Sequence, residues 1–198
     1  MPIVPVDLLR IRPFAFSVAG SVCLFAAQMC GFVALPFLIQ GSLGRSGIET
    51  GLLMTAWPAA IGLVAPVAGW LSDHVSAALL CGGGALGMSL ALAGVALWPS
   101  DFPPAAMATL LACGGAGFAL FQTPNNRTML LSAPKARSGA AGGSLATARQ
   151  FGQALGAVLV ALCLALSAAS GPRAALVLAA LLALSAAAIG WRRPPVSP

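Results

Sequence analysis

Arg149 is the ionisable side chain that lies deepest in an apolar stretch of this 198-residue chain. A charge at membrane depth costs several kcal/mol by most estimates, so each such residue is a candidate for function. Two interpretations stay open: a guanidinium that reaches back to the lipid headgroups, and a charge that faces a substrate. Gln28, in the middle of another apolar stretch, is either a hydrogen-bonding partner between helices or part of a polar pathway.

Nucleophilic catalysis is the other chemistry that the residue types allow. Gly87-Met-Ser89 has the G-x-S pattern of an intramembrane serine protease, which needs a histidine within hydrogen-bonding reach of the serine. His74 is about fifteen residues away, roughly 22 Å along the helical direction, so that dyad cannot form. A second match, Gly142-Gly-Ser144, lies on the same side as His74 but has nothing nearby that resembles an oxyanion site. We expect no enzyme, and an intramembrane enzyme is a remote alternative.

The cysteines do not form a metal-binding or redox pattern. They lie inside apolar stretches, without the close pairs or clustered histidine and acidic partners that such sites need. We interpret them as small hydrophobic residues, at positions Cys23, Cys30, Cys81, Cys113 and Cys163. We therefore predict no catalytic residue, no cofactor and no metal.

The composition shows which elements must position these residues. Hydrophobic residues make up 59% of the chain, charged residues 7%, and the mean hydropathy is +0.95. A soluble domain carries about 25% charged residues, and a disordered chain has low hydrophobicity, so both classes are excluded. Ten basic residues stand against four acidic ones, but they are scattered between apolar runs, which argues against nucleic acid. The chain is an all-α membrane protein in contact with a lipid bilayer.

A helix needs about 20 apolar residues to cross the hydrocarbon core of a bilayer. Six such runs are present, and we predict spans at about 14–40, 50–71, 77–98, 105–124, 145–169 and 174–191. The second is preceded by Ser46-Gly-Ile-Glu49, which has the spacing of a capping box. Residues 1–13 and 192–198 flank the six-span unit, and residues such as 99–104 form short connections between spans.

The fifth span is predicted to begin between Gly139 and Thr147. A helix from Gly139 would be about 46 Å long, which exceeds the hydrocarbon thickness. Its first two turns then lie among the headgroups, and Arg149 lies roughly one turn inside the boundary.

The distribution of lysine and arginine predicts the orientation in the membrane, because cytoplasmic loops carry an excess of both. With the N-terminus inside, seven basic residues are cytoplasmic and two, Arg45 and Arg173, are outside. The seven are Arg10, Arg12, Arg127, Lys135, Arg137, Arg192 and Arg193. We predict a multi-pass protein of the cell (inner) membrane with both termini in the cytoplasm.

Small residues are expected to hold the spans together, since apolar side chains gain little by meeting one another in lipid. Gly83 and Gly87, and also Gly152 and Gly156, are four residues apart and predict one smooth packing stripe each. The glycines at 114, 115 and 117 predict a notch in the fourth span.

Several segments resemble the major facilitator superfamily. The segments 51–58 and 66–73, which end in Trp-Pro and Leu-Ser-Asp73, look like its span-loop signature, with Trp70, His74 and Ser76 where the family carries basic residues. The segments 117–127, 137–143 and 147–156 are similar to the C-terminal part of EmrB/QacA-type drug:proton antiporters.

This resemblance implies one six-span half of a transporter that exports small, cationic or amphipathic compounds in exchange for protons, by alternating access against a second half or a second copy. No acidic residue lies deep in a span, so a proton-binding carboxylate is expected in the other half. The alternative is a non-transporting remnant or subunit that needs a partner half. Asp73 either meets a helix N-terminus or is solvated. The candidates for the transport path or its gate are Gln28, Asp73, Gln122, Asn125, Arg127 and Arg149.

Overall fold

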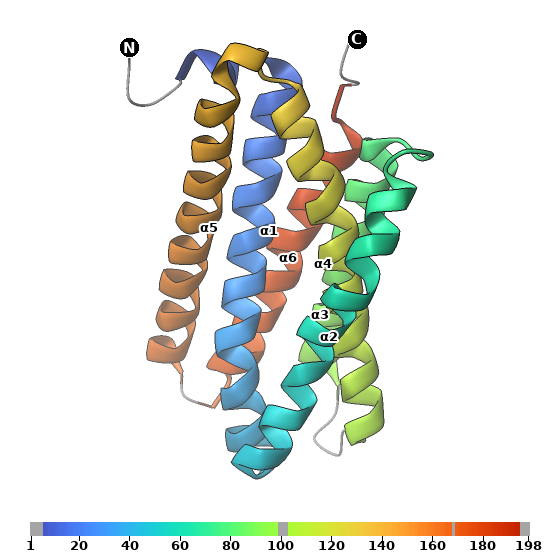
Figure 1. The fold of residues 1–198 in the computed structure, drawn as a ribbon. Coiled ribbons are helices and arrows are strands. Elements are labelled where there is room, and N and C mark those ends of the chain that lie inside the picture. Colours follow the sequence, from blue (N-terminus) through green and yellow to red (C-terminus); the bar gives the residue numbers. More distant parts are fainter. Residues whose placement is uncertain (1–5, 99–102, 168, 195–198) are drawn as a thin grey trace.

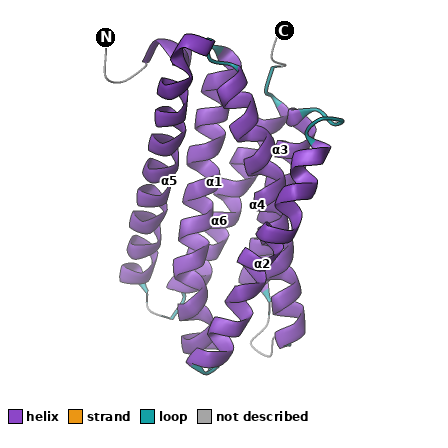
Figure 2. Cartoon of the chain, viewed as in Figure 1, coloured by secondary structure: helices purple, strands orange, loops and turns teal. Residues whose placement is uncertain are grey.

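The computed structural model describes residues 6–98, 103–167 and 169–194. Within these residues every regular element is a helix (Figure 2), which confirms the predicted all-α class. Six of the helices are long and apolar enough to cross a membrane. They are α1 (Arg12–Pro36), which continues as the π-helix η2 (Phe37–Ser42), α2 (Gly47–Leu71), α3 (Ala77–Leu97), α4 (Pro104–Leu131), α5 (Ser138–Leu166) and α6 (Gly171–Trp191). Two short 3-10 helices, η1 (Val6–Arg10) and η3 (Lys135–Arg137), precede α1 and α5.

Three predicted segments that flank or connect the spans lie partly outside the residues that the structure describes. They are residues 99–102 of the predicted connection 99–104, residues 1–5 of the predicted N-terminal segment and residues 195–198 of the predicted tail. At the start of α2, the predicted capping box is confirmed. The backbone N–H of Glu49 donates to Ser46 Oγ over 3.2 Å, and the N–H of Ser46 donates to Glu49 Oε2 over 3.0 Å. These two hydrogen bonds cap the N-terminus of α2, which begins at Gly47.

Two helices differ most from the predicted spans, each by seven residues at one end. Helix α4 does not end at Pro124 but continues to Leu131, and α5 begins at Ser138 and ends at Leu166. The end of α4 is polar and is typical of a loop, yet Asn125 is buried there and forms hydrogen bonds with Ser17 and Ser21 of α1. Glycines at the start of α5 weaken its helical pattern. Tertiary contacts compensate, because Ala141 packs with Leu8, Phe14 and Met129.

The helices form two layers (Figure 1). Helices α5, α1, α4 and α2 lie in front in that view, with α6 and α3 behind them. Helix α3 packs on both α6 and α4, and α1 packs on both α5 and α6, whereas α2 packs mainly on α4. Helices α2 and α5 are therefore the least covered, with 17% of their most apolar segment buried. The start of α1 and the end of α6 lie at the same end of the bundle.

Glycines allow the closest helix contacts, and one of the two predicted stripes is confirmed. A Cβ atom on Gly152 would lie 2.7 Å from the carbonyl oxygen of Val22, and one on Gly156 would overlap Ala26, so this stripe seats α5 on α1. The prediction for Gly83 and Gly87 is wrong, since a Cβ on either would meet no described atom within 4 Å.

The glycine that matters on α3 is Gly84, where a Cβ would lie 2.6 Å from the carbonyl oxygen of Gly117 on α4. The predicted notch in the fourth span is confirmed. Trp57 of α2, which is 2% exposed, packs against Gly114 and Gly115, and the backbone of α3 packs against Gly117.

Candidate functional site: a polar groove between α4 and α5

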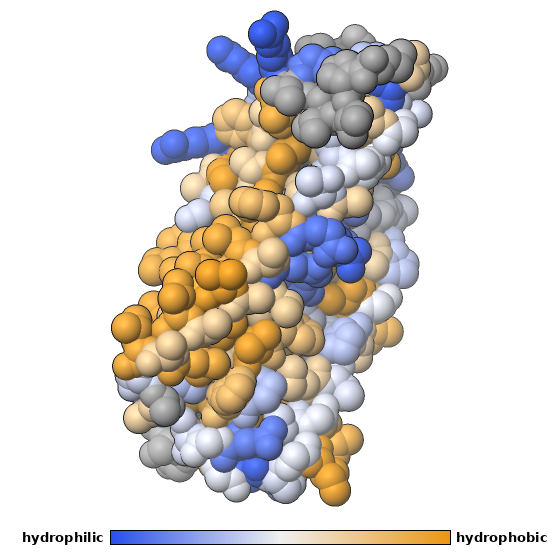
Figure 3. Space-filling model, turned by 90° about the vertical axis from the view of Figure 1, so that its left-hand side faces the viewer, coloured by the Kyte–Doolittle hydropathy of each residue, from blue (hydrophilic) through white to orange (hydrophobic). Residues whose placement is uncertain are grey.

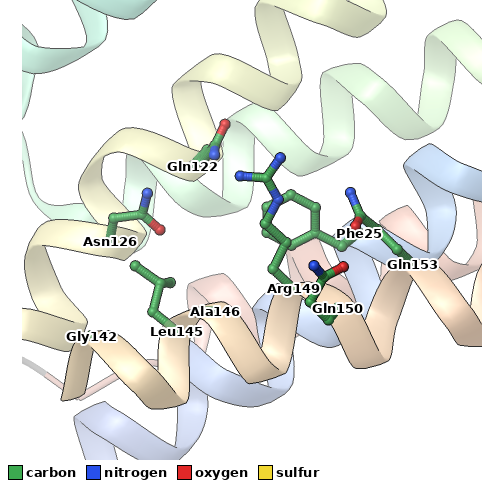
Figure 4. A pocket seen from close by; sticks show the side chains of 9 residues that line it. All are labelled: Phe25, Gln122, Asn126, Gly142, Leu145, Ala146, Arg149, Gln150 and Gln153. Carbon is green, nitrogen blue, oxygen red and sulfur yellow. The ribbon is translucent and has the colours of Figure 1, made fainter. Parts of the chain in front are cut away.

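A groove of about 320 Å³ opens between α4 and α5, above Phe25 of α1 (Figure 4). Viewed from the side on which α5 lies, hydrophilic atoms gather part of the way along a largely apolar surface (Figure 3). The groove combines one guanidinium, four carboxamides and one aromatic ring. Its lining residues are Phe25, Gln122, Asn126, Gly142, Leu145, Ala146, Arg149, Gln150 and Gln153.

Helical periodicity explains why these polar side chains meet. Gln122 and Asn126 are four residues apart on α4, and so are Arg149 and Gln153 on α5, so each pair shares one helix face. Arg149 lies about 16 Å from the start of α5, and Gln122 lies about 13 Å from the end of α4. Since α5 starts at the end of the bundle where α4 stops, both residues lie at a similar depth.

Arg149 has a defined position in the groove. Its guanidinium carbon lies 5.5 Å from the centroid of the Phe25 ring, which is the geometry of a cation–π contact. Phe25 is itself held by an edge-on contact with Phe118, with ring centroids 5.4 Å apart. The guanidinium therefore lies over an immobilised ring and faces Gln122 across the groove (Figure 4).

No described carboxylate neutralises Arg149. Of the chain's four acidic residues, Asp7 pairs with Arg137, Asp73 pairs with Arg127, and Glu49 caps α2. The fourth, Asp101, lies outside the described residues. In the described structure the guanidinium of Arg149 lies over the ring of Phe25 and pairs with no carboxylate.

The structure brings Asp73 and Arg127 together, away from the groove. Arg127 donates to the carboxylate of Asp73 and, over 3.2 Å, to the carbonyl oxygen of Ser72. The pair joins the α2–α3 turn to the end of α4. The carboxylate thus meets a side-chain cation, and not the helix N-terminus considered from the sequence. About half of each side chain is exposed, so the pair contributes little stability, about 0 to 1 kcal/mol.

Asn125 does not line the groove. It is 1% exposed, and its amide donates to Ser21 Oγ over 2.8 Å and to the carbonyl oxygen of Ser17 over 3.3 Å. Its oxygen accepts a hydrogen bond from Arg193, which is 6% exposed and also donates to Cys81 Sγ over 3.4 Å. We call Ser17, Ser21, Cys81, Asn125 and Arg193 the interior cluster.

The interior cluster joins α1, α3 and α4 to the segment after α6. Burial lowers the pKa of Arg193 from its ordinary value, while contact with Cys81 acts in the opposite direction. An arginine in a protein remains protonated, so the cluster holds a buried positive charge. Its Nε atom has no hydrogen-bonding partner in the described structure.

Gln28 lies three residues after Phe25 on α1 and is partly buried, but it is not among the residues that line the groove. Of the predicted candidates, Gln122 and Arg149 lie in the groove, Asp73 and Arg127 pair at one end of the bundle, and Asn125 lies in the interior.

Sequence reasoning missed five residues: Phe25, Asn126, Gln150 and Gln153 in the groove, and Arg193 in the interior. The four-residue spacing of Gln122 with Asn126, and of Arg149 with Gln153, was a usable signal. For Arg193 there was none, because a basic residue just after the last span is typical of an exposed tail.

The residues considered for serine chemistry are engaged elsewhere. Ser89 Oγ donates to the carbonyl oxygen of Ala180 over 2.7 Å, and Ser144 Oγ donates to that of Ala140 over 3.0 Å. His74 Nδ1 lies 3.0 Å from the carbonyl oxygen of Trp70. Within the described residues, no hydrogen bond joins His74 to either serine.

Comparison with known proteins points to transport. The sequence is 48% identical to the uncharacterized transporter YebQ of Escherichia coli (strain K12), over 98% of this chain and 42% of that protein. It is 33% identical to the riboflavin transporter RibZ of Clostridioides difficile (strain 630), over 71% of this chain and 30% of that protein. It is also 34% identical to the multi-drug resistance efflux pump PmrA homolog of Lactococcus lactis subsp. lactis (strain IL1403), over 68% of this chain and 33% of that protein.

The chain spans less than half the length of the curated relatives that it matches. Residues 17–198 match the sequence pattern described as Major Facilitator Superfamily, and this range includes nearly all of the six-helix bundle. With six membrane-length helices and relatives named as transporters, the chain belongs to the major facilitator superfamily.

Proposed function

We propose that this chain is one half of a transporter that moves a small amphipathic solute across the inner membrane. The observation that carries the proposal is the polar groove, whose lining on α5 runs from Gly142, about one turn inside the start of that helix, to Gln153 near its middle. Helix α5 is about 43 Å long and places Arg149 more than a third of the way along it. Transporters of this type bind their solute near the middle of the bilayer, where two repeats meet.

The least covered helices support a partner half. Large apolar side chains are exposed on α2, where Leu63 is 77% exposed, and on α5, where Leu162 is 56% exposed. This chain supplies the α4 and α5 walls of the groove and leaves its open side uncovered. A second six-helix half, or a second copy of this chain, would supply the facing wall.

Resemblance to EmrB/QacA-type antiporters supports export in exchange for protons, and one relative is named a multi-drug resistance efflux pump homolog. The described spans carry no carboxylate in their interior, so in this proposal the proton-binding group belongs to the partner half. The non-enzymatic character of the family agrees with a transport role. Another relative is named a riboflavin transporter, which supports solutes of similar size.

The proposal is tested by complementation. Residues 1–198 are expressed in a pump-deficient bacterial host, either alone or with the part of the E. coli relative that this chain does not cover. We expect gradient-dependent dye exclusion only from the pair. Exclusion by this chain alone would mean that it transports without a foreign half. No exclusion by a pair that is inserted and associated would contradict the proposed function.

Orientation is tested in the same host. After removal of the native cysteines, Arg45→Cys should react with an impermeant reagent from outside, and Lys135→Cys only after permeabilisation. The opposite pattern would contradict the proposed cytoplasmic termini.

A further inference from the structure

We propose that the groove between α4 and α5 binds an organic anion, with Arg149 as the residue that recognises its negative charge. The inference rests on the proposed function, because it names the class of solute that the transporter half would bind. It concerns charge selection, for which the resemblance alone favours cationic compounds.

The first argument is the charge of the lining. Arg149 is the only charged side chain that lines the groove, and the other polar lining side chains are neutral carboxamides. Among described residues it is the only lysine or arginine more than two turns from both ends of its helix. An uncompensated cation at this depth is costly, and the cost falls when an anion binds beside it. A cationic solute would be repelled.

The second argument is that Arg149, unlike three other arginines, has no hydrogen-bonding partner among the described residues. Arg127 and Arg137 hold carboxylates, and Arg193 donates to Asn125 and Cys81. Arg149 forms no hydrogen bond with a described residue, and its guanidinium lies over the ring of Phe25. Its N–H groups are therefore available to a ligand, and a guanidinium binds carboxylate or sulfonate groups through two parallel hydrogen bonds.

The third argument is positioning. The Phe25 ring holds the guanidinium in the groove, so less conformational freedom is lost when the anion binds. Gln122, Asn126 and Gln153 line the same groove with groups that both donate and accept hydrogen bonds. The volume of about 320 Å³ matches a drug-sized molecule. The fitting solute is an organic anion with further polar substituents.

The test compares fluorescein, which is anionic, with rhodamine 123, a cation with the same tricyclic skeleton. Binding to residues 1–198 in phosphatidylcholine nanodiscs is measured by fluorescence anisotropy. We expect fluorescein to bind at least about tenfold more tightly, since tenfold corresponds to one hydrogen-bonded charge contact. High salt should weaken fluorescein binding.

Three variants assign the effect to Arg149. Arg149→Gln should weaken fluorescein binding about tenfold and leave rhodamine 123 unchanged or tighter. Gln122→Glu places a carboxylate opposite Arg149. It should change the binding of the two dyes in the same directions without removing the arginine. Arg12→Gln removes an equal charge from an exposed position at the start of α1 and should change neither dye.

Equal binding of the two dyes, a preference for rhodamine 123, or no binding of fluorescein by folded protein would overturn the inference. Fluorescein affinity unaffected by both Arg149→Gln and Gln122→Glu would overturn it as well. Transport is scored separately in the complementation assay. Binding of fluorescein without transport would count against the proposed function and leave the anion site intact. Gradient-dependent export of rhodamine 123 without fluorescein binding would do the reverse.

Discussion

The interior cluster and the groove contain the same kinds of side chain in opposite surroundings. In each, an arginine lies within the bundle together with carboxamide side chains, one in the interior cluster and four in the groove. Arg193 is 6% exposed and donates to Asn125 and Cys81, and Asn125 in turn donates to α1. Arg149 is exposed on the groove side and donates to no described residue, although four carboxamides line the same groove.

This difference separates a structural site from a binding site. A buried polar group that has partners costs little, but the loss of one partner exposes the full desolvation penalty of the other. The interior cluster is therefore expected to stabilise the fold. The polar side chains of the groove have no hydrogen-bonding partners in the described structure, so substituting one of them should cost little stability. Their hydrogen-bonding groups remain available to a ligand.

The largest effect on stability is expected in the interior cluster. Asn125→Ala removes the acceptor of Arg193 and leaves a buried guanidinium with Cys81 as its remaining partner. We expect a loss of about 3 kcal/mol, measured by unfolding with SDS in mixed micelles. Asn126→Ala is the matched control, because the adjacent residue lines the groove, and it should cost less than about 0.5 kcal/mol. Equal costs would remove the distinction between the two sites.

An intermediate effect is expected where the groove is attached to the bundle. Gly156→Ala places a Cβ against the carbonyl of Ala26 and pushes α5 away from α1. We expect a loss of about 1 to 3 kcal/mol, together with weaker ligand binding, since α5 carries Arg149. Gly143→Ala on the same helix meets no described atom within 4 Å. If it were as destabilising as Gly156→Ala, close contact with α1 would not be the cause.

A smaller effect is expected for Arg149 itself. Arg149→Ala removes the contact with Phe25, which is worth about 0.5 to 1 kcal/mol at an exposed site. Arg149→Lys should keep most of that stability, because it retains the charge, but should bind fluorescein less well since an ammonium lacks the planar fork. Heat stability in detergent and dye binding measure the two properties separately. A loss above about 3 kcal/mol in Arg149→Ala would make this residue as structural as Arg193.

The smallest effect is expected for the exposed pair of Asp73 and Arg127. Asp73→Asn should cost about 0 to 1 kcal/mol at low ionic strength. The difference from the unmodified protein should shrink in high salt, because exposed charges are screened. A salt-independent loss above about 1 kcal/mol would show that this pair resembles the interior cluster.

Local information was sufficient for much of this architecture. Hydropathy sums over consecutive residues, so six membrane-length helices could be predicted without any knowledge of contacts. The capping box at Ser46 and Glu49 is equally local. The superfamily was recognisable from short segments, and the family match confirms it. Helix ends that depend on partners were not predictable, as the extension of α4 beyond Pro124 shows.

The sequence by itself determined the number and type of the helices, the family, and two members of the groove, Gln122 and Arg149. Only the tertiary structure decided which face each helix presents to its neighbours. In the structure Asn125 lies in the interior and Asn126 in the groove. Helix α3 contacts α4 through Gly84 and not through Gly83, and Arg193 is buried. The physical reason is that lipid and protein interior are both apolar. A membrane helix therefore lacks the polar face that reveals the orientation of a helix in water, and packing alone sets its rotation.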